Sequence, residues 1–221
     1  MRGTMATLKE RLEAMRNGSK LKPEIEAAFA RYFSEAHPEP LANGSRIPHF
    51  SLPDHAGRIV SSIDLLQQGP LVITFFRGTW CPYCNAEMAA LNDAYDSIRA
   101  TGAELVAISP QSAQSAGDYR SEHPLKFSVL IDTNARVAES FGLAYILPDY
   151  LQAFYRHAFR TDLTAINDGK TWRLPVPGRF IADRDGTIVD VEANADYRFR
   201  PEPEAIVPIL KRLALGPVRK A

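Results

Sequence analysis

The sequence predicts an α/β protein in which helices cover both faces of a parallel sheet. Short apolar runs and amphipathic helical segments alternate through the middle of the chain in the order βαβαβα, which is typical of this class. The 221 residues suffice for one sizeable domain with an appendage. Hydrophobic residues make up 45% of the chain and charged residues 24%, which is ordinary for a globular protein.

The charge balance does not indicate any particular class of partner. Lys and Arg together number 26, as do Asp and Glu, so the formal net charge is zero. No basic excess therefore indicates a nucleic acid or an acidic membrane surface as a partner. No apolar run approaches the ~20 residues that span a bilayer, so we do not expect an integral membrane protein.

The chain before residue 46 predicts a helical extension. Apolar residues repeat at helical spacing in residues 6–16, and again after Pro23. The opening residues lack the continuous apolar core of a secretory signal, so we expect a cytoplasmic protein. Residues 37–48 are rich in Pro, Gly, Asn and Ser and predict a linker. We therefore divide the chain into an extension with its linker (1–45), a main domain (46–215) and a tail (216–221).

The main domain is predicted from its periodicities. An apolar strand at residues 70–76 precedes a helix from about Cys84 to Ala100. The following elements are a strand at 103–109, a helix at 113–122, a strand at 127–131 and a helix at 134–141, which Gly142 ends.

The C-terminal part of the domain shows a hairpin and a closing helix. Two alternating runs flank Asp185-Gly186 within residues 179–193, which favours a β-hairpin. A helix is expected over residues 202–215, with a kink at Pro208. The aromatic segment 144–173 has mixed spacing, so we expect one short helix at about 149–159 and an irregular loop.

Both cysteines of the chain, Cys81 and Cys84, lie in the stretch FFRGTWCPYCNAEM. A structural zinc site would need four ligands, and the five histidines are scattered with no second paired motif. Two inert buried thiols are the other alternative, since free cysteine is often buried. The position of the pair between a buried strand and a helix favours a redox role over both.

The helix beginning explains how such a pair could react. Unpaired N–H groups and the helix dipole favour negative charge in the first turn, and they would lower a thiol pKa from its free value of ~8.5. Pro82 would fix the turn, so that one thiol attacks and the other resolves. Trp80 and Tyr83 could shield the site and offer a flat apolar contact, or could be plain packing.

The sequence RLPVPGRF, residues 173–180, is a candidate to face the two cysteines. X-Pro bonds are the ones that readily become cis, and a cis proline would present a backbone edge to the substrate. Pro175 and Pro177 are the candidates, and Pro177 is preferred because a strand begins directly after it. The alternative is a pair of trans prolines that stiffen a loop.

The chain resembles the peroxiredoxin and thioredoxin superfamily, and more narrowly the alkyl hydroperoxide reductase and thiol-specific antioxidant family. The matching stretches cover about residues 46–214; they are IPHFSLPDHAGRIVSSIDLL, LVITFFRGTWCPYCNAEM, VAISPQS, LPVPGRFIADRDGTIVD and DYRFRPEPEAIV. The resemblance implies a thioredoxin-like fold, with a central mixed sheet flanked by helices. The opening helices lie outside the shared core.

The peroxiredoxin pattern Pro-x-x-x-Thr-x-x-Cys places Cys84 at the peroxide-attacking position, with Glu87 matching a glutamate of one branch. Cys81 then takes the threonine position and Arg77 the proline position, while the family's peroxide-polarising arginine falls on Pro177. Two polar residues of the family pattern, the threonine and the arginine, are thus replaced by Cys81 and Pro177.

Arg77 or Arg179 could substitute for these two polar residues, or either could be a solvated surface arginine. The thioredoxin pattern reverses the thiol roles, since Cys81 precedes the helix and attacks, and Cys84 resolves. We expect Cys81 to attack disulfides and Cys84 to attack peroxides. Thr79 completes the supporting residues beside the motif.

The resemblance implies a thiol-dependent peroxidase that reduces hydrogen peroxide or organic hydroperoxides through a Cys81/Cys84 dithiol-disulfide cycle. It needs no metal or other cofactor, and a thioredoxin-like or glutathione-like reductant would restore it. One alternative is a protein-disulfide oxidoreductase that uses the same pair. The other is an interaction or scaffold module without thiol turnover, in which residues 6–36 and 145–159 bind a partner or form a homodimer.

Overall fold

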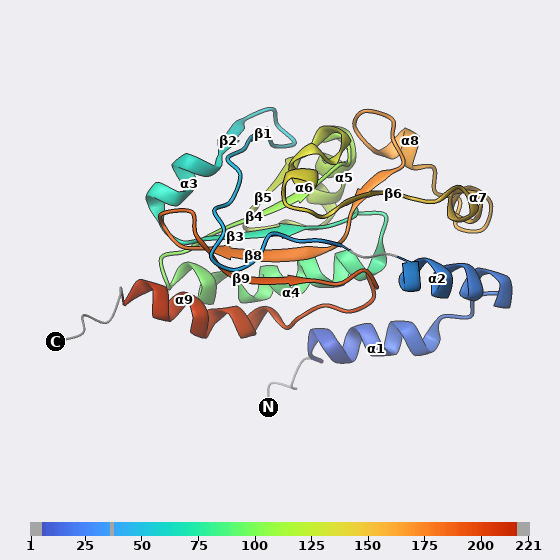
Figure 1. The fold of residues 1–221 in the computed structure, drawn as a ribbon, viewed down its shortest axis with the longest axis horizontal. Helices are drawn as coiled ribbons and strands as arrows, with labels where there is room; N and C mark the ends of the chain where they lie inside the picture. Colours follow the sequence, from blue (N-terminus) through green and yellow to red (C-terminus); the bar gives the residue numbers. More distant parts are fainter. Residues whose placement is uncertain (1–5, 36–37, 216–221) are drawn as a thin grey trace.

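A five-stranded sheet forms the centre of the computed structural model, which describes residues 6–35 and 38–215 (Figure 1). The strand order is β5-β4-β3-β8-β9. The strands are β3 (Leu71–Phe75), β4 (Glu104–Ser109), β5 (Ser128–Ile131), β8 (Gly178–Ala182) and β9 (Ile188–Ala193). β3, β4 and β5 are parallel, whereas β8 is antiparallel to both β3 and β9. The parallel sheet predicted from the element order thus holds for three strands, and the mixed sheet implied by the resemblance is confirmed.

Helices cover both faces of this sheet. They are α3 (Ser62–Gln68), α4 (Pro82–Arg99), α5 (Ala113–Glu122), α6 (Arg136–Ser140) and α9 (Val207–Ala214). One hydrophobic cluster joins α4, α5 and α9 to one face, and a second cluster joins α3 and α6 to the other. Because both faces are covered, the central strands β3 and β8 are buried at all five of their residues.

Local chemistry explains where several elements begin. Helix α4 starts at Pro82 instead of the predicted Cys84, because proline has the φ of a first helical residue and needs no N–H partner there. The predicted closing helix is split into a 3-10 turn (Pro203–Ile206) and α9, so the break precedes Pro208. The helix predicted at 134–141 likewise begins as a 3-10 turn (Thr133–Ala135) before α6.

The two predicted N-terminal helices are present and pack onto the rest of the molecule. α1 (Leu8–Gly18) begins with a capping box between Thr7 and Glu10, and it buries Leu8 and Leu12 in the cluster around α4. α2 (Pro23–Glu35) joins a third cluster together with α7 (Asp149–His157). Figure 1 shows α1 beside α4 and α2 near α7. The predicted tail, residues 216–221, and positions 36–37 lie outside the described residues.

Short elements that the sequence did not predict complete the fold. β1 (Ser51–Pro53) pairs antiparallel with β2 (Ile59–Ser61). In the aromatic segment, β6 (Ala144–Ile146) pairs antiparallel with β7 (Arg173–Pro175), and α8 (Leu163–Ile166) follows the predicted helix α7. Strands of three residues are too short to show a recognisable alternation of apolar and polar residues. Among residues 6–35 and 38–215, no helix has the length and apolar character needed to cross a bilayer.

Candidate functional site

The two thiols lie at the beginning of α4, where the sheet strand β3 leads into the helix. Cys81 is the N-cap residue and Cys84 lies in the first turn, and both are free and buried. The Cys81 N–H donates to the carbonyl oxygen of Gly78 at 3.1 Å, and the Asn85 N–H donates to the carbonyl oxygen of Cys81 at 3.0 Å. The backbone therefore fixes the position of Cys81 from both sides.

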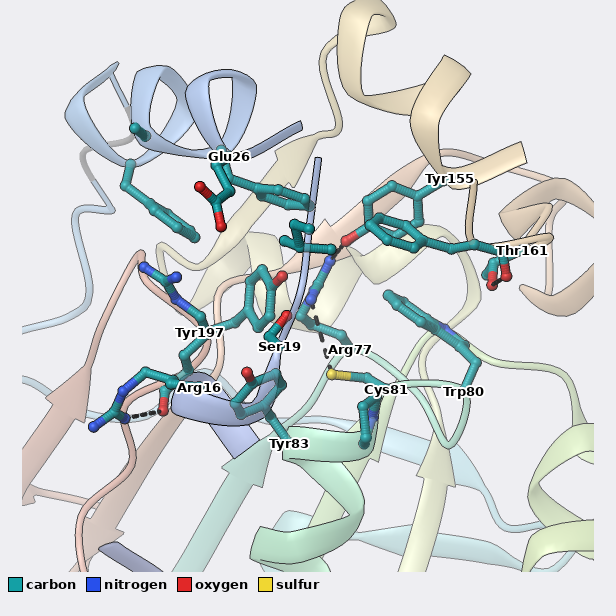
Figure 2. Close-up of a pocket in the computed structure, with 17 residues that line it drawn as sticks. Arg16, Ser19, Glu26, Arg77, Trp80, Cys81, Tyr83, Tyr155, Thr161 and Tyr197 are labelled. Carbon is teal, nitrogen blue, oxygen red and sulfur yellow. Dashed lines mark hydrogen bonds between the residues drawn. The ribbon is translucent and has the colours of Figure 1, made fainter. Parts of the chain in front are cut away.

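Arg77, two residues after β3, is a buried cation beside Cys81. Its side chain is almost completely buried, and its Nη1 lies 3.8 Å from the Cys81 sulfur. Nη2 donates to the Tyr155 hydroxyl, and the guanidinium lies 3.9 Å from the ring centre of Tyr197 (Figure 2). The alternative that Arg77 is a solvated surface residue is therefore wrong, because three aromatic side chains, including Trp80, enclose it.

A second buried arginine lies beside Cys84. Arg200 donates from Nε to Glu87 at 2.6 Å, and its Nη2 lies 3.7 Å from the Cys84 sulfur. The side chains of Arg200 and Glu87 are each only 3% exposed. The sequence indicates Glu87 but not Arg200, since Arg200 lies 116 positions after Cys84 in the chain. The only signal was its place in the stretch DYRFRPEPEAIV, which carried the family resemblance.

These neighbours give the two thiols different pKa values. Burial alone raises the pKa of Cys81, but a hydrogen bond from the Cys84 thiol and the charges of Arg77 and Arg200 outweigh it and lower the pKa to about 6. Burial raises the pKa of Cys84 well above its ordinary value, and the neighbouring Cys81 raises it further. Cys81 is therefore the thiolate near neutral pH, and Cys84 keeps its proton.

A cavity of about 570 Å³ opens onto this site. Its wall includes Cys81 but not Cys84, and Figure 2 shows the Cys81 sulfur and Arg77 pointing into it. Trp80, Pro82 and Tyr83 also line the cavity, so the two aromatic residues flank the Cys81 sulfur, and both also pack against the hydrophobic core. A ligand in the cavity can therefore contact the Cys81 sulfur, whereas Cys84 lies behind Cys81.

The loop before Cys81 is held by polar contacts and by one glycine. The Thr79 N–H donates to Gln111 Oε1 at 2.8 Å, and Asn85 donates to the Thr79 carbonyl oxygen at 2.8 Å. Gly78 has a φ of +140°, and a Cβ there would lie 2.4 Å from the indole nitrogen of Trp80. Only glycine permits both this backbone and the position of the indole.

The prediction of a cis proline opposite the cysteines is wrong. Within the described segments no peptide bond is cis, and β8 begins directly after a trans Pro177. Pro177 borders a separate cavity of about 420 Å³ that Glu87 and Arg200 also line. Pro175 lies in β7 and pairs with Ala144.

Arg179 is also buried, so the alternative that it is a solvated surface residue is wrong. Its side chain is 2% exposed, and Nη2 contacts Glu192 at 3.2 Å and the carbonyl oxygen of Glu202 at 3.3 Å. It donates to neither sulfur. Of the two arginines that could replace the missing polar residues, only Arg77 contacts a thiol.

Comparisons with known proteins give a consistent result. The AhpC/TSA family matches residues 43–191. Peroxiredoxin Q of rice chloroplasts (Oryza sativa subsp. japonica) is 30% identical over 47% of this chain and 47% of its own length. The thiol-disulfide oxidoreductase ResA of Bacillus cereus is 24% identical over 73% of this chain and 74% of its own length. The chain thus spans about half the length of the peroxiredoxin Q relatives that it matches.

Solved structures show the same fold. Peroxidoxin BcpB of Mycobacterium tuberculosis aligns with a TM-score of 0.60 at 20% identity, over 79% of this chain and 97% of that chain. Peroxiredoxin Q of Xanthomonas campestris aligns with a TM-score of 0.57 at 17% identity, over 75% of this chain and 91% of that chain. The thioredoxin-like fold implied by the resemblance is confirmed.

Proposed function

The chain belongs to the AhpC/TSA family, and from that premise we propose that it is a thiol-dependent peroxidase in which Cys81 attacks the peroxide. One observation carries this proposal. The thiol that lines the cavity is the one whose pKa is lowered to about 6, and a buried arginine lies 3.8 Å from its sulfur. A thiolate is the nucleophilic form of cysteine, so Cys81 is ready to react at neutral pH.

The first step transfers one oxygen. The Cys81 thiolate attacks the outer oxygen of R–O–O–H, the O–O bond breaks, and the products are Cys81–SOH and RO⁻, which takes a proton from solvent to become ROH. Arg77 can stabilise both the thiolate and the negative charge that develops on the leaving oxygen, because its guanidinium is buried beside the sulfur.

The second step closes the disulfide. The Cys84 thiol loses its proton and attacks the Cys81 sulfur, so that water leaves and a Cys81–Cys84 disulfide forms. Arg200 supports this step, because it lies 3.7 Å from the Cys84 sulfur and favours the thiolate as it forms. Two molecules of an external thiol then restore both cysteines and leave as a disulfide. This assignment replaces the expectation that Cys84 attacks peroxides.

The test uses reduced protein and a slight excess of hydrogen peroxide, followed by free thiols and intact mass. Wild type should lose two hydrogens within seconds. Cys84→Ser should stop at a single added oxygen on Cys81, and Cys81→Ser should show neither change. A single-oxygen adduct that forms on Cys84 in Cys81→Ser, at the wild-type rate, would overturn the assignment.

A protein-disulfide oxidoreductase is the second candidate. Its support is the place of Cys81 as the first residue of a CxxC at the helix N-cap, with a buried resolving thiol behind it. ResA of Bacillus cereus, named as a thiol-disulfide oxidoreductase, also matches most of this chain. Peroxide-dependent oxidation of a reduced thiol, compared with reduction of insulin disulfides, separates the two activities.

The partners and location are proposals of the same kind. A thioredoxin-like or glutathione-like reductant is supported by the dithiol cycle, which needs two electrons from thiols in each turn. The cytoplasm is supported because such a cycle requires a reducing compartment. A homodimer would have exposed apolar side chains available in Ile59 and Ile63, on the neighbouring elements β2 and α3. A scaffold role without turnover would leave activity intact when both cysteines are replaced by serine.

A further inference from the structure

The cavity over Cys81 has walls of aromatic rings. They come from four parts of the chain: Phe29 and Phe33 from α2, Tyr155 and Phe159 from α7 and the residues after it, Tyr197 from the loop after β9, and Trp80 and Tyr83 on either side of Cys81. Phe29 lies edge-on to Tyr197 at 5.9 Å between ring centres, and Tyr155 lies edge-on to Phe159 at 5.4 Å. Edge-to-face and stacked geometries are those in which a further ring is held well.

Much of this wall lies outside the part of the chain that matches the family. The match covers residues 43–191, whereas α1 and α2 precede it and Tyr197 follows it. Figure 2 shows Glu26 of α2 on the side of the cavity opposite to Cys81, with Tyr197 between them. The extension therefore contributes to the site, because α1 and α2 supply part of the wall of the cavity above the Cys81 sulfur.

The charges at the rim of the cavity are balanced. Arg198 binds Asp196 through two hydrogen bonds, from Nε at 2.8 Å and from Nη2 at 2.6 Å. Arg16 lies 3.8 Å from Glu13, and Glu26 adds a further negative charge to the lining. The charges at the rim thus do not favour an anionic over a cationic ligand. We therefore expect the aromatic walls to determine which ligand binds.

A buried cation lies at the floor of the cavity. Arg77 lines the cavity, and its Nη1 lies 3.8 Å from the Cys81 sulfur. A guanidinium in this position can donate hydrogen bonds to a small oxygen acceptor beside the sulfur. The cavity therefore fits a molecule with an apolar ring at one end and a small oxygen acceptor at the other.

The size of the cavity points away from hydrogen peroxide alone. Its volume of about 570 Å³ lies in the range of sites for small organic ligands, ~300–1,000 Å³. A water molecule takes up only ~30 Å³ of liquid, and hydrogen peroxide is one oxygen larger. Hydrogen peroxide would leave most of the aromatic wall unused.

We propose that this cavity is a specificity site for arylalkyl hydroperoxides, whose ring lies against Phe29, Phe33 and Tyr197 while the hydroperoxide group reaches Cys81 and Arg77. The inference rests on the proposed peroxidase function and adds the substrate class. The reaction is the one given above: the outer oxygen passes to Cys81 as a sulfenic acid, and the arylalkyl alkoxide takes a proton and leaves as the alcohol.

The test compares cumene hydroperoxide with tert-butyl hydroperoxide, since both are tertiary hydroperoxides and differ in one phenyl group. With dithiothreitol as the reductant, kcat/KM for the cumene compound should exceed that for the tert-butyl compound by about tenfold or more. The alcohol product, 2-phenyl-2-propanol, should slow alkylation of Cys81 by iodoacetamide, whereas tert-butanol at the same concentration should not.

Variants on α2 locate the ring. Ala30 lines the cavity and is exposed, so Ala30→Trp should fill the cavity without removing core packing. It should lower kcat/KM for cumene hydroperoxide about tenfold and leave hydrogen peroxide within about twofold. Ala27→Trp is the matched control, because Ala27 is exposed on the same helix but does not line the cavity. Phe29→Leu, which keeps an apolar side chain but removes one ring, should lower only the cumene rate.

The outcomes separate this inference from the proposed function. Similar rates for the cumene and tert-butyl compounds, without protection by the aromatic alcohol, would overturn the ring site while peroxidase activity stands. If no hydroperoxide is reduced, the peroxidase proposal fails and the alcohol experiment decides on the ring site alone. Protection that Ala30→Trp abolishes would then support it, and equal alkylation with and without the alcohol would reject it.

Discussion

Replacement of Arg77 by methionine tests the electrostatic basis of the site. The guanidinium Nη1 lies 3.8 Å from the Cys81 sulfur. With an effective dielectric constant of about 20, two unit charges at this distance interact by about 4 kcal/mol, which corresponds to about 3 pKa units. This is an upper limit, because Arg200 remains and the protein relaxes. We expect the Cys81 pKa to rise from about 6 by about 1–3 units in Arg77→Met.

The consequence is a loss of thiolate at neutral pH. A pKa of about 6 leaves ~90% of Cys81 ionised at pH ~7, whereas a pKa of ~8 leaves ~10%, so the alkylation rate should fall about ninefold. The assay measures the rate of iodoacetamide modification of reduced protein across a range of pH, with mass spectrometry to identify Cys81. The midpoint of the pH profile gives the pKa directly.

Two matched variants control for folding. Arg77→Lys keeps the positive charge, so its midpoint should stay closer to wild type than that of Arg77→Met. Arg179→Met removes an arginine that is equally buried but donates to neither sulfur, so it should lose stability without a comparable shift. If Arg77→Met and Arg179→Met move the midpoint by the same amount, the direct role of Arg77 is refuted.

Three further predictions concern stability and the loop at the site. Reduced protein should become more stable from pH ~6 to pH ~9, because the folded Cys81 pKa of about 6 lies below that of the unfolded chain; urea titrations of wild type against Cys81→Ser should show this slope in wild type alone. Glu87→Gln should lower the free energy of unfolding by about 3 kcal/mol, since it leaves the buried Arg200 without its counter-charge; a loss in the double variant Glu87→Gln/Arg200→Met equal to the sum of the losses in the two single variants would contradict a pairwise interaction. Gly78→Ala should disturb the indole of Trp80 and slow Cys81 alkylation, and an unchanged tryptophan emission spectrum together with an unchanged rate would contradict the steric argument.

Local patterns were enough to predict most of the regular structure. The helical spacing of Leu8 and Leu12 and the apolar run of β3 each identify an element, because periodicity reports which face is buried. The hairpin around Asp185-Gly186 and the place of the CxxC between strand and helix were predicted in the same way. These features depend on residues that are neighbours in sequence.

The site residues that were predicted wrongly or not at all are those whose position depends on long-range contacts. Pro177 was assigned to the site from its place before a strand, yet its peptide bond is trans and it borders a different cavity. Arg200 was missed because it approaches Cys84 only after β8, β9 and the following loop have folded back. No local pattern reports such an approach.

By itself, the sequence determined that this is an α/β chain with a vicinal thiol pair at the start of a helix, and it provided the residues of a redox motif. The tertiary structure alone decided which thiol is ionised, because the pKa of Cys81 depends on burial, on the Cys84 thiol and on two arginines whose positions follow from packing. It also decided that α2 and α7 enclose a cavity above that sulfur. Electrostatic interactions depend on distance in space and on the surrounding dielectric, and neither can be read from the order of residues along the chain.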